Sequence, residues 1–277
     1  MPTDNVKQTL QQYLLFILSY VDSATGWSWD SRYDPYIGSA YIGPADPLTA
    51  QVVLFLKGDG INNSTSIIDS SPNPKTMTAN GNAKISTALS KYGGSSLLFD
   101  GTTNCYVSTL STFALNKTTQ NFTEEAWVYM TGYANNNNGY YHSTIAAKDS
   151  VGSREFSFAI VGTASSYTGL NFTGFYGSNG SSNYVVTGNF NFALNTFYHV
   201  AASRQNGTLR LFVNGTKIAE EAFNYSLNAS NVSHKIGANL YDNYYPYYFK
   251  GHIDSYRLTI GTGRYIDNFD PETIYLA

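Results

Sequence analysis

The feature that most constrains this fold is a short strand pattern held between two Asn-Gly dipeptides. Leu209, Leu211 and Val213 recur at every second position, and Asn206-Gly207 and Asn214-Gly215 flank the run. Asn-Gly is typical of type I′ hairpin turns, because both of its residues tolerate a positive φ. The pattern therefore predicts three consecutive antiparallel strands over residues 198–204, 208–213 and 216–220.

Similar strand-like runs, separated by turn residues, continue from about residue 50 to residue 260. The strongest are 51–57, 95–100, 122–130, 144–147, 156–160, 169–176, 184–187, 234–236 and 250–260. Five Asn-Gly pairs mark turns, and no segment repeats at a fixed length, which argues against a solenoid or a propeller. We expect an all-β domain over residues 50–277, built as a two-sheet antiparallel sandwich.

Residues 1–49 have a different character. Apolar residues recur at spacings of three and four from Val6 to Val21, which predicts an amphipathic helix beginning near Thr3. Residues 22–49 show no sustained period and predict an extended arm. We expect four aromatic residues to anchor that arm: Trp27, Trp29, Tyr33 and Tyr36. A single amphipathic helix needs a surface to pack on, and that surface is either its own sandwich or another subunit of a larger assembly.

The composition excludes several partners and compartments. Only 13% of residues are charged and the net charge is −3, so neither nucleic acid nor an anionic membrane is an expected partner. The apolar run 13–21 is too short to span a bilayer, and the segment before it does not resemble a secretory leader. Cys105 is the only cysteine, so no intramolecular disulfide forms. We expect a chain that stays in a cytosol-like compartment.

The sequence carries no familiar catalytic signature. The Gly-x-Ser-x-Gly, phosphate-loop, His-Glu-x-x-His and Cys-x-x-Cys patterns are all absent. His199 and His252 fall in expected strands, where we interpret them as hydrogen-bonded structural residues. The carboxylate pairs Glu124-Glu125 and Glu220-Glu221 are adjacent, and neighbours on a strand point to opposite faces. Because glycoside hydrolysis needs two acids in one cleft, we expect no enzymatic activity.

Two loops rich in tyrosine and asparagine, 133–141 and 241–248, are the strongest binding candidates. Tyrosine rings stack on the apolar faces of sugars, while asparagine side chains bond to their hydroxyls. Exposed tyrosines also suit protein interfaces, so both a neutral glycan and a protein remain possible partners. The candidate residues are Tyr140, Tyr141, Tyr241, Asn243, Tyr244 and Tyr245.

Four segments together resemble a known family. They are 91–101 (KYGGSSLLFDG), 122–129 (FTEEAWVY), 197–215 and 249–258. In this order they are similar to the laminin-G-like, concanavalin A-like lectin/glucanase superfamily. The closing stretch 257–271 resembles versions of the domain found in bacteriophage tail-fibre and virion decoration proteins.

The resemblance implies a jelly-roll sandwich that binds glycans on its curved sheet or rim loops, often beside a structural calcium. The matching calcium ligands would be Asp69, Asn73 and Asp254. The acidic motif of the glucanase branch is absent, so the resemblance implies binding without hydrolysis.

The resulting functional prediction is a non-enzymatic virion structural protein, either a tail or head fibre or a capsid decoration. It would assemble in the host cytoplasm and contact other virion proteins through residues 1–49. Its lectin-like domain would serve adhesion to host-surface glycans or shell stabilisation. We expect a homo-oligomer, with a trimer as the form that such displayed domains often take. The alternatives are a free, extracellular carbohydrate-binding lectin and a polysaccharide-cleaving enzyme.

Overall fold

The computed structural model describes residues 27–30, 40–44, 46–109, 120–133, 141–150, 152–240 and 247–273. The chain divides into two compact units, residues 1–50 with 271–277, and residues 51–270. The predicted helix from Thr3 to Val21 lies outside the described residues, as do Tyr33 and Tyr36.

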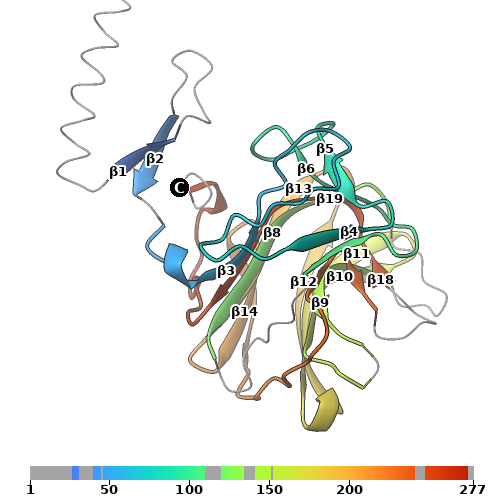
Figure 1. Cartoon of the computed structure of the whole chain (residues 1–277). Helices are drawn as coiled ribbons and strands as arrows, with labels where there is room; N and C mark the ends of the chain where they lie inside the picture. Colours follow the sequence, from blue (N-terminus) through green and yellow to red (C-terminus); the bar gives the residue numbers. More distant parts are fainter. Residues whose placement is uncertain are drawn as a thin grey trace, which may run out of the picture. The chain divides into compact units, whose positions relative to one another are not determined.

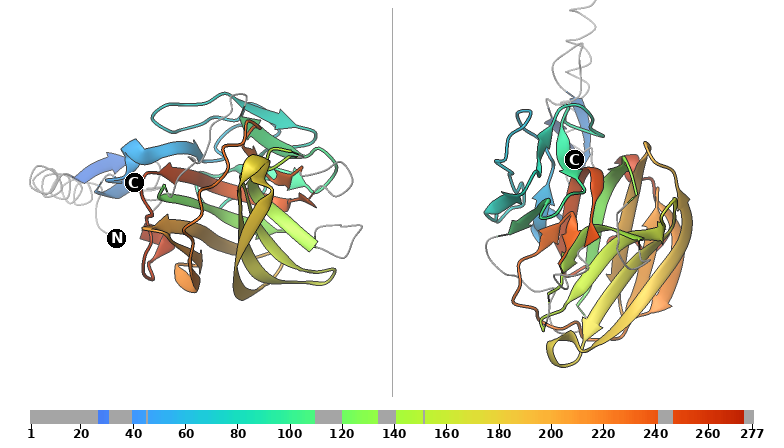
Figure 2. Two further views of the ribbon diagram at one scale, coloured as in Figure 1. Left: turned by 90° about the horizontal axis from the view of Figure 1, so that it is seen from below. Right: turned by 90° about the vertical axis from the view of Figure 1, so that its right-hand side faces the viewer.

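The larger unit is a sandwich of two antiparallel sheets, as predicted (Figure 1). The seven-stranded sheet has the order β12 (Ser182–Phe192), β11 (Ser166–Tyr176), β10 (Phe156–Thr163), β9 (Tyr141–Lys148), β16 (Lys235–Ile236), β7 (Tyr106–Thr109) and β4 (Met77–Asn80). The eight-stranded sheet has the order β15 (Thr216–Ala222), β14 (Thr208–Val213), β13 (Phe197–Gln205), β8 (Phe122–Met130), β19 (Lys250–Ile260), β6 (Ser96–Asp100) and β5 (Lys84–Ser86), with β3 (Val52–Leu56) paired to β19. In Figure 2 the green-to-yellow strands β9 to β12 lie side by side.

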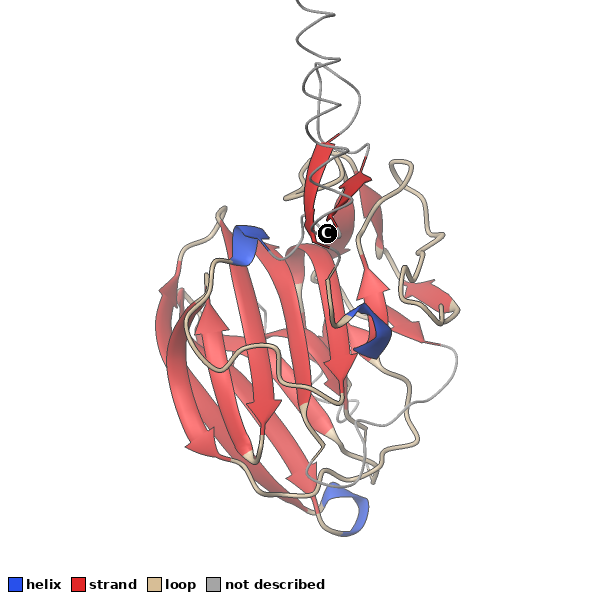
Figure 3. Cartoon of the chain, turned by 90° about the vertical axis from the view of Figure 1, so that its left-hand side faces the viewer, coloured by secondary structure: helices blue, strands red, loops and turns tan. Residues whose placement is uncertain are grey.

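Helical structure is confined to single turns in the described part of the chain. These turns are η1 (Thr49–Gln51), η2 (Ser178–Gly180) and η3 (Pro271–Thr273). Figure 3 shows them in blue among the red strands. None of the helices in the described ranges has the length and apolar character required to cross a membrane.

The smaller unit contains a hairpin that the sequence did not reveal. β1 (Trp27–Asp30) pairs antiparallel with β2 (Ala40–Pro44), and Trp29 lies opposite Tyr41. The register shifts between Trp27 and Trp29. Because residues 31–39 separate the strands, no two-residue turn signal marks this hairpin, and the segment was expected to be an extended arm.

The two Asn-Gly turns behave as predicted. Asn206 and Gly207 have φ values of 50° and 73°, and Asn214 and Gly215 have 48° and 73°. Two consecutive left-handed residues are what a type I′ turn requires. β13, β14 and β15 are therefore neighbouring antiparallel strands, as the sequence indicated.

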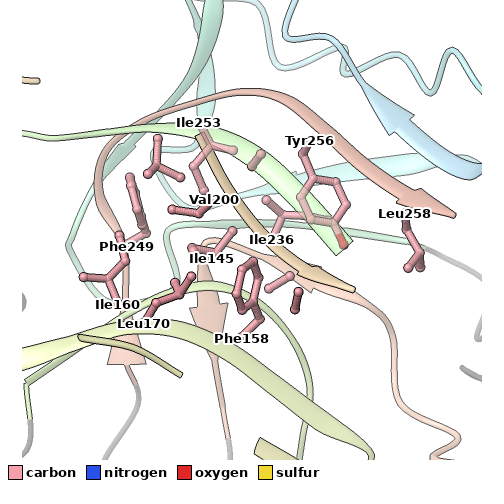
Figure 4. Packing of buried hydrophobic residues seen from close by; sticks show 14 of the residues in the cluster. Ile145, Phe158, Ile160, Leu170, Val200, Ile236, Phe249, Ile253, Tyr256 and Leu258 are labelled. Carbon is pink, nitrogen blue, oxygen red and sulfur yellow. The ribbon is translucent and has the colours of Figure 1, made fainter. Parts of the chain in front are cut away.

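The core lies between the sheets and takes alternate residues from each strand. On β10 the buried members are Phe156, Phe158 and Ile160. Leu209, Leu211 and Val213, the alternating residues of the sequence pattern, belong to the same cluster. Figure 4 shows that side chains from both sheets meet here. The residues that alternate with these core residues along each strand consequently point toward the outer faces of the sandwich.

Candidate functional site

The two tyrosine-rich loops meet at their described ends. Tyr141 begins β9, and Tyr247 begins β18 (Tyr247–Tyr248), which pairs with β17 (Ala238–Asn239). Both β17 and β18 contact β9. The ring of His142 stacks on that of Tyr247, with centroids 4.8 Å apart and planes at 28°. The fold thus brings together loops that are about a hundred residues apart in the sequence.

Of the six predicted binding residues, the structure describes only Tyr141, which is half-buried at the start of β9. Tyr140, Tyr241, Asn243, Tyr244 and Tyr245 lie outside the described residues, and their roles stay predictions. The stacked pair His142–Tyr247 was not predicted, because no pattern in the sequence links these two residues. Burial lowers the pKa of His142 below its ordinary value of 6.5, so the ring is neutral at pH 7 and offers an uncharged aromatic surface.

An uncharged sheet surface adjoins this ring pair. His142 lies opposite Val161 of β10, and Val161 lies opposite Gly169 of β11. Gly169 in turn lies opposite Asn189 of β12. Because Ile160 and Leu170 point into the core, this row belongs to the outer face of the seven-stranded sheet.

Across β9 to β12 the outward side chains are small, apolar or neutral polar; Lys235 of the next strand, β16, lies opposite Ala147 at their border and is mostly buried. We call the outward residues of β9 to β12 the uncharged face; they are His142, Thr144, Ala147, Ser157, Ala159, Val161, Gly169, Asn171, Thr173, Val185, Thr187 and Asn189. On the edge strand β12 Val185, Thr187 and Asn189 are exposed, whereas Thr144 on β9 is fully buried. The signal was present in the sequence, since no Asp, Glu, Lys or Arg occurs between Glu155 and Arg204.

Two oxygen atoms of this face lack hydrogen-bond partners among the described residues. Thr144 Oγ1 and Asn171 Oδ1 are both buried and unbonded. Each lies beside Ala159 in one row across three strands. A buried polar atom left unbonded costs about 1–3 kcal/mol, so a water molecule or a hydroxyl group that reached this row would be stabilised.

The predicted calcium ligands are occupied by the protein's own donors. The Asp69 carboxylate accepts hydrogen bonds from the amides of Phe55, Ser71 and Lys75 and from Ser71 Oγ, at 2.7–2.9 Å. Its oxygens therefore face N–H and O–H groups and hold a turn.

Asp254 has a comparable environment. Its carboxylate accepts hydrogen bonds from the amides of Lys91 and Tyr92 and from Ser255 Oγ, and burial raises its pKa to about 6. Asn73 is exposed. In the described ranges, no three His, Cys, Asp or Glu side chains come together to hold a metal. These donors do not suit a calcium ion at Asp69, Asn73 and Asp254, because each carboxylate already accepts N–H and O–H groups.

The adjacent glutamates Glu124 and Glu125 are both fully buried and have separate partners, as strand alternation requires. Glu124 Oε1 accepts a 2.5 Å hydrogen bond from Tyr256, and the Nε2 atom of His234 lies 3.5 Å away. Burial raises the pKa of Glu124 to about 8, so this carboxyl is protonated at neutral pH.

Glu125 forms a buried ionic cluster with the closing segment of the sandwich. Its carboxylate accepts hydrogen bonds from Arg257 Nε at 2.8 Å and from the Tyr265 hydroxyl at 2.7 Å, and His199 Nε2 lies 3.2 Å away. Burial alone would raise its pKa, but the Arg257 guanidinium and His199 hold the pKa well below its usual range.

Two histidines are hydrogen-bonded inside the sandwich, as predicted. His199 contacts Glu125, and His252 Nδ1 lies 2.8 Å from Ser96 Oγ. The adjacent carboxylates Glu220 and Glu221 also have separate partners. Glu220 forms ion pairs with Arg210 and Lys217, whereas Glu221 accepts a hydrogen bond from the Tyr184 hydroxyl.

A family model of the laminin G type, described as "Concanavalin A-like lectin/glucanases superfamily", matches residues 100–259. A comparison with curated protein sequences finds no match.

Several solved structures are similar in fold. Domain 4 of AbnA, an extracellular arabinanase from Geobacillus stearothermophilus solved with arabinotriose, is 19% identical with a TM-score of 0.55; the match covers 82% of this chain and 98% of that one. The binding domain of Paraclostridial mosquitocidal protein 1 is 14% identical with a TM-score of 0.57, and the match covers 79% of this chain and 50% of that one. The binding domain of botulinum neurotoxin DC, solved with SialylT, is 14% identical with a TM-score of 0.53. This match covers 82% of this chain and 51% of that one.

Proposed function

The chain belongs to the concanavalin A-like lectin/glucanase superfamily, and we propose that its sandwich is a non-enzymatic domain that binds a neutral glycan on the uncharged face. The observation that carries this proposal is the position of the stacked His142–Tyr247 pair beside a surface whose strands β10 to β12 contain no charged residue.

The chemistry of this surface matches that of a sugar. A pyranose or furanose presents C–H groups that pack against aromatic rings and hydroxyls that bond to amide and hydroxyl side chains. The ring pair supplies the first kind of contact, and Asn171, Thr173 and Asn189 supply the second. On β10 to β12 a charged ligand would lose its hydration without gaining an opposite charge, so a neutral glycan is favoured over an acidic one.

The fold neighbours support the ligand class. The arabinanase domain was solved with arabinotriose and the neurotoxin binding domain with SialylT. Of these two, arabinotriose is the uncharged type of ligand that our proposal requires.

Calorimetry with the full chain and a panel of neutral and acidic oligosaccharides tests the proposal. We expect binding to a neutral member, a loss of at least tenfold in affinity in Tyr247→Ala, and no cleavage products. Tyr176→Ala is the matched control, because Tyr176 is also half-buried and its ring stacks on another tyrosine, Tyr225, at 4.5 Å. Binding of acidic glycans only, or equal loss in the two variants, would contradict the proposal.

We also propose that residues 1–49 attach this domain to a larger assembly, for which the resemblance of the closing stretch suggests a virion. The division of the chain into two units favours an attachment part and a displayed part. The closing stretch itself has a structural task, since Arg257 and Tyr265 both bind Glu125. Removal of residues 1–49 should abolish incorporation into particles while glycan binding persists; normal incorporation would refute the attachment role.

A further inference from the structure

The dipeptide Asn-Gly, which occurs five times in the chain, is chemically reactive. The backbone nitrogen of the glycine can attack the side-chain carbonyl of the asparagine, since glycine has no Cβ to block the approach. Four of the pairs begin at Asn80, Asn179, Asn206 and Asn214, and the fifth, at Asn138, lies outside the described residues. Because a glycine follows in every case, differences in reactivity among the four described sites reflect the fold around them.

The reaction converts the amide into a carboxylate and consumes only water. The glycine nitrogen loses its proton to solvent and forms a bond to Cγ of the asparagine, the Cγ–Nδ2 bond breaks, and ammonia leaves. Water then opens the cyclic imide at one of its two carbonyls. Opening at Cγ gives aspartate, and opening at the α-carbonyl gives isoaspartate, whose main chain is one carbon longer. A site is therefore protected when hydrogen bonds hold the asparagine side chain or the glycine nitrogen away from each other.

Two of the sites hold the asparagine side chain firmly. Asn80 Nδ2 donates hydrogen bonds to the Thr78 carbonyl and to Ser108 Oγ, both at 3.1 Å. Asn214 Oδ1 accepts a hydrogen bond from the backbone amide of His199 at 2.9 Å. Ring closure at either site would first break these bonds.

The site at Asn206 is held mainly through its backbone. The Asn206 amide donates to Asn121 Oδ1 at 2.9 Å, and the Gly207 carbonyl accepts from the Phe223 amide at 2.7 Å. The side chain has a weaker restraint, because Gln205 Nε2 lies 3.3 Å from Asn206 Oδ1. We expect this site to be less protected than Asn214 but still restrained.

Asn179 is the least restrained of the four. It is exposed in the η2 turn between β11 and β12, with φ 56° and ψ 19°. Its side chain makes no hydrogen bond to another described residue. The Gly180 amide donates to the Gly177 carbonyl at 3.3 Å, and the Asn179 carbonyl accepts from the Arg154 amide at the same distance. Both distances exceed the usual N–H···O range, so the reacting nitrogen is only weakly held.

We propose that Asn179 is a deamidation site of this protein, converted to aspartate and isoaspartate before the other described Asn-Gly pairs. The product places a carboxylate at the turn between β11 and β12, within the stretch from Glu155 to Arg204 that has no charged residue of its own between these two. Aspartate, like asparagine, adopts the left-handed conformation, so this product preserves the turn. The modification goes beyond the proposed function and does not depend on it, because no glycan takes part.

Peptide mapping of the full chain, kept folded in mildly alkaline water enriched in heavy oxygen, tests the proposal. Alkaline conditions favour loss of the glycine proton, and each site that reacts takes up the label. Asn179 should become labelled about tenfold faster than Asn214, a ratio that corresponds to about 1.4 kcal/mol and to the net value of one hydrogen bond.

The same chain unfolded in urea is the matched control. Its four sites should react at similar rates, because each asparagine is followed by glycine and the fold no longer restrains any of them. Equal labelling of Asn179 and Asn214 in the folded chain would overturn the proposal. An equally large lead of Asn179 in the unfolded chain would do the same, because the order would then not arise from the fold.

Isoelectric focusing of two aged variants gives a second test. Asn214→Asp should gain a further acidic band at the rate of wild type, because Asn179 is intact in it. Asn179→Asp begins with the additional charge and should gain no further band over the same period. A further band of equal intensity in both variants would contradict the assignment to Asn179.

Discussion

Replacement of Glu125 by Gln should destabilise the sandwich strongly, because it leaves a buried guanidinium without its counter-ion. Arg257 is 3% exposed and donates to Glu125 at 2.8 Å, while Tyr265 and His199 contact the same carboxylate. Removing one partner of a buried ion pair costs about 3–5 kcal/mol. For a domain of this size 1 kcal/mol shifts the Tm by about 2–4 °C, so we expect a decrease on the order of 10 °C.

Urea unfolding and calorimetry of Glu125→Gln measure this loss. Glu220→Gln is the control, because Glu220 pairs with Arg210 and Lys217 at the surface and should contribute little. The pKa of Glu125 is held below its unfolded value, so its stabilisation is present above pH 4.5 and is lost as the pH falls toward the folded pKa. The difference between wild type and Glu125→Gln should therefore shrink in acid. A loss no larger than that of Glu220→Gln would refute this account of the cluster.

Three further predictions concern other parts of the sandwich. Burial raises the pKa of Glu124 to about 8, so wild type should lose stability between pH 4.5 and pH 8, where Glu124→Gln should unfold at higher urea concentration; a parallel pH profile would contradict this. Gly207→Ala should cost more than Gly152→Ala by urea unfolding, because both have φ near +73° but only at Gly207 would a Cβ meet Asn224; equal losses would show that strain alone acts. Chelation of calcium should leave the Tm unchanged, because protein donors occupy the Asp69 and Asp254 carboxylates; a decrease would identify a calcium site.

The parts of the fold that were predictable depend on local signals. The turns at Asn206 and Asn214 are set by two residues each, and β8, β14 and β19 have the predicted bounds. β4, β5 and β7 were missed because they have only three or four residues each and pair in ladders that are equally short. The β1–β2 hairpin was missed because nine residues, 31–39, separate its strands, so no two-residue hairpin turn marks it.

The candidate site was only partly predictable. Strand alternation was enough to separate Glu124 from Glu125, but their partners lie more than a hundred residues away in sequence, at Tyr256 and Arg257. The aromatic loops were identified, yet the contact between His142 and Tyr247 depends on the position of β18 against β9. Asp69 was assigned to calcium by the family resemblance. A carboxylate in a turn is compatible with either a cation or amide donors, and sequence alone does not distinguish the two.

Titration of the isotope-labelled chain with a neutral oligosaccharide, followed by amide chemical shifts, tests the central claim most directly. The account predicts shifts concentrated at Tyr247 and in β10 to β12, with β13 to β15 unaffected, and loss of these shifts in Tyr247→Ala. An unchanged spectrum with every neutral glycan, or shifts confined to β13 to β15, would contradict it.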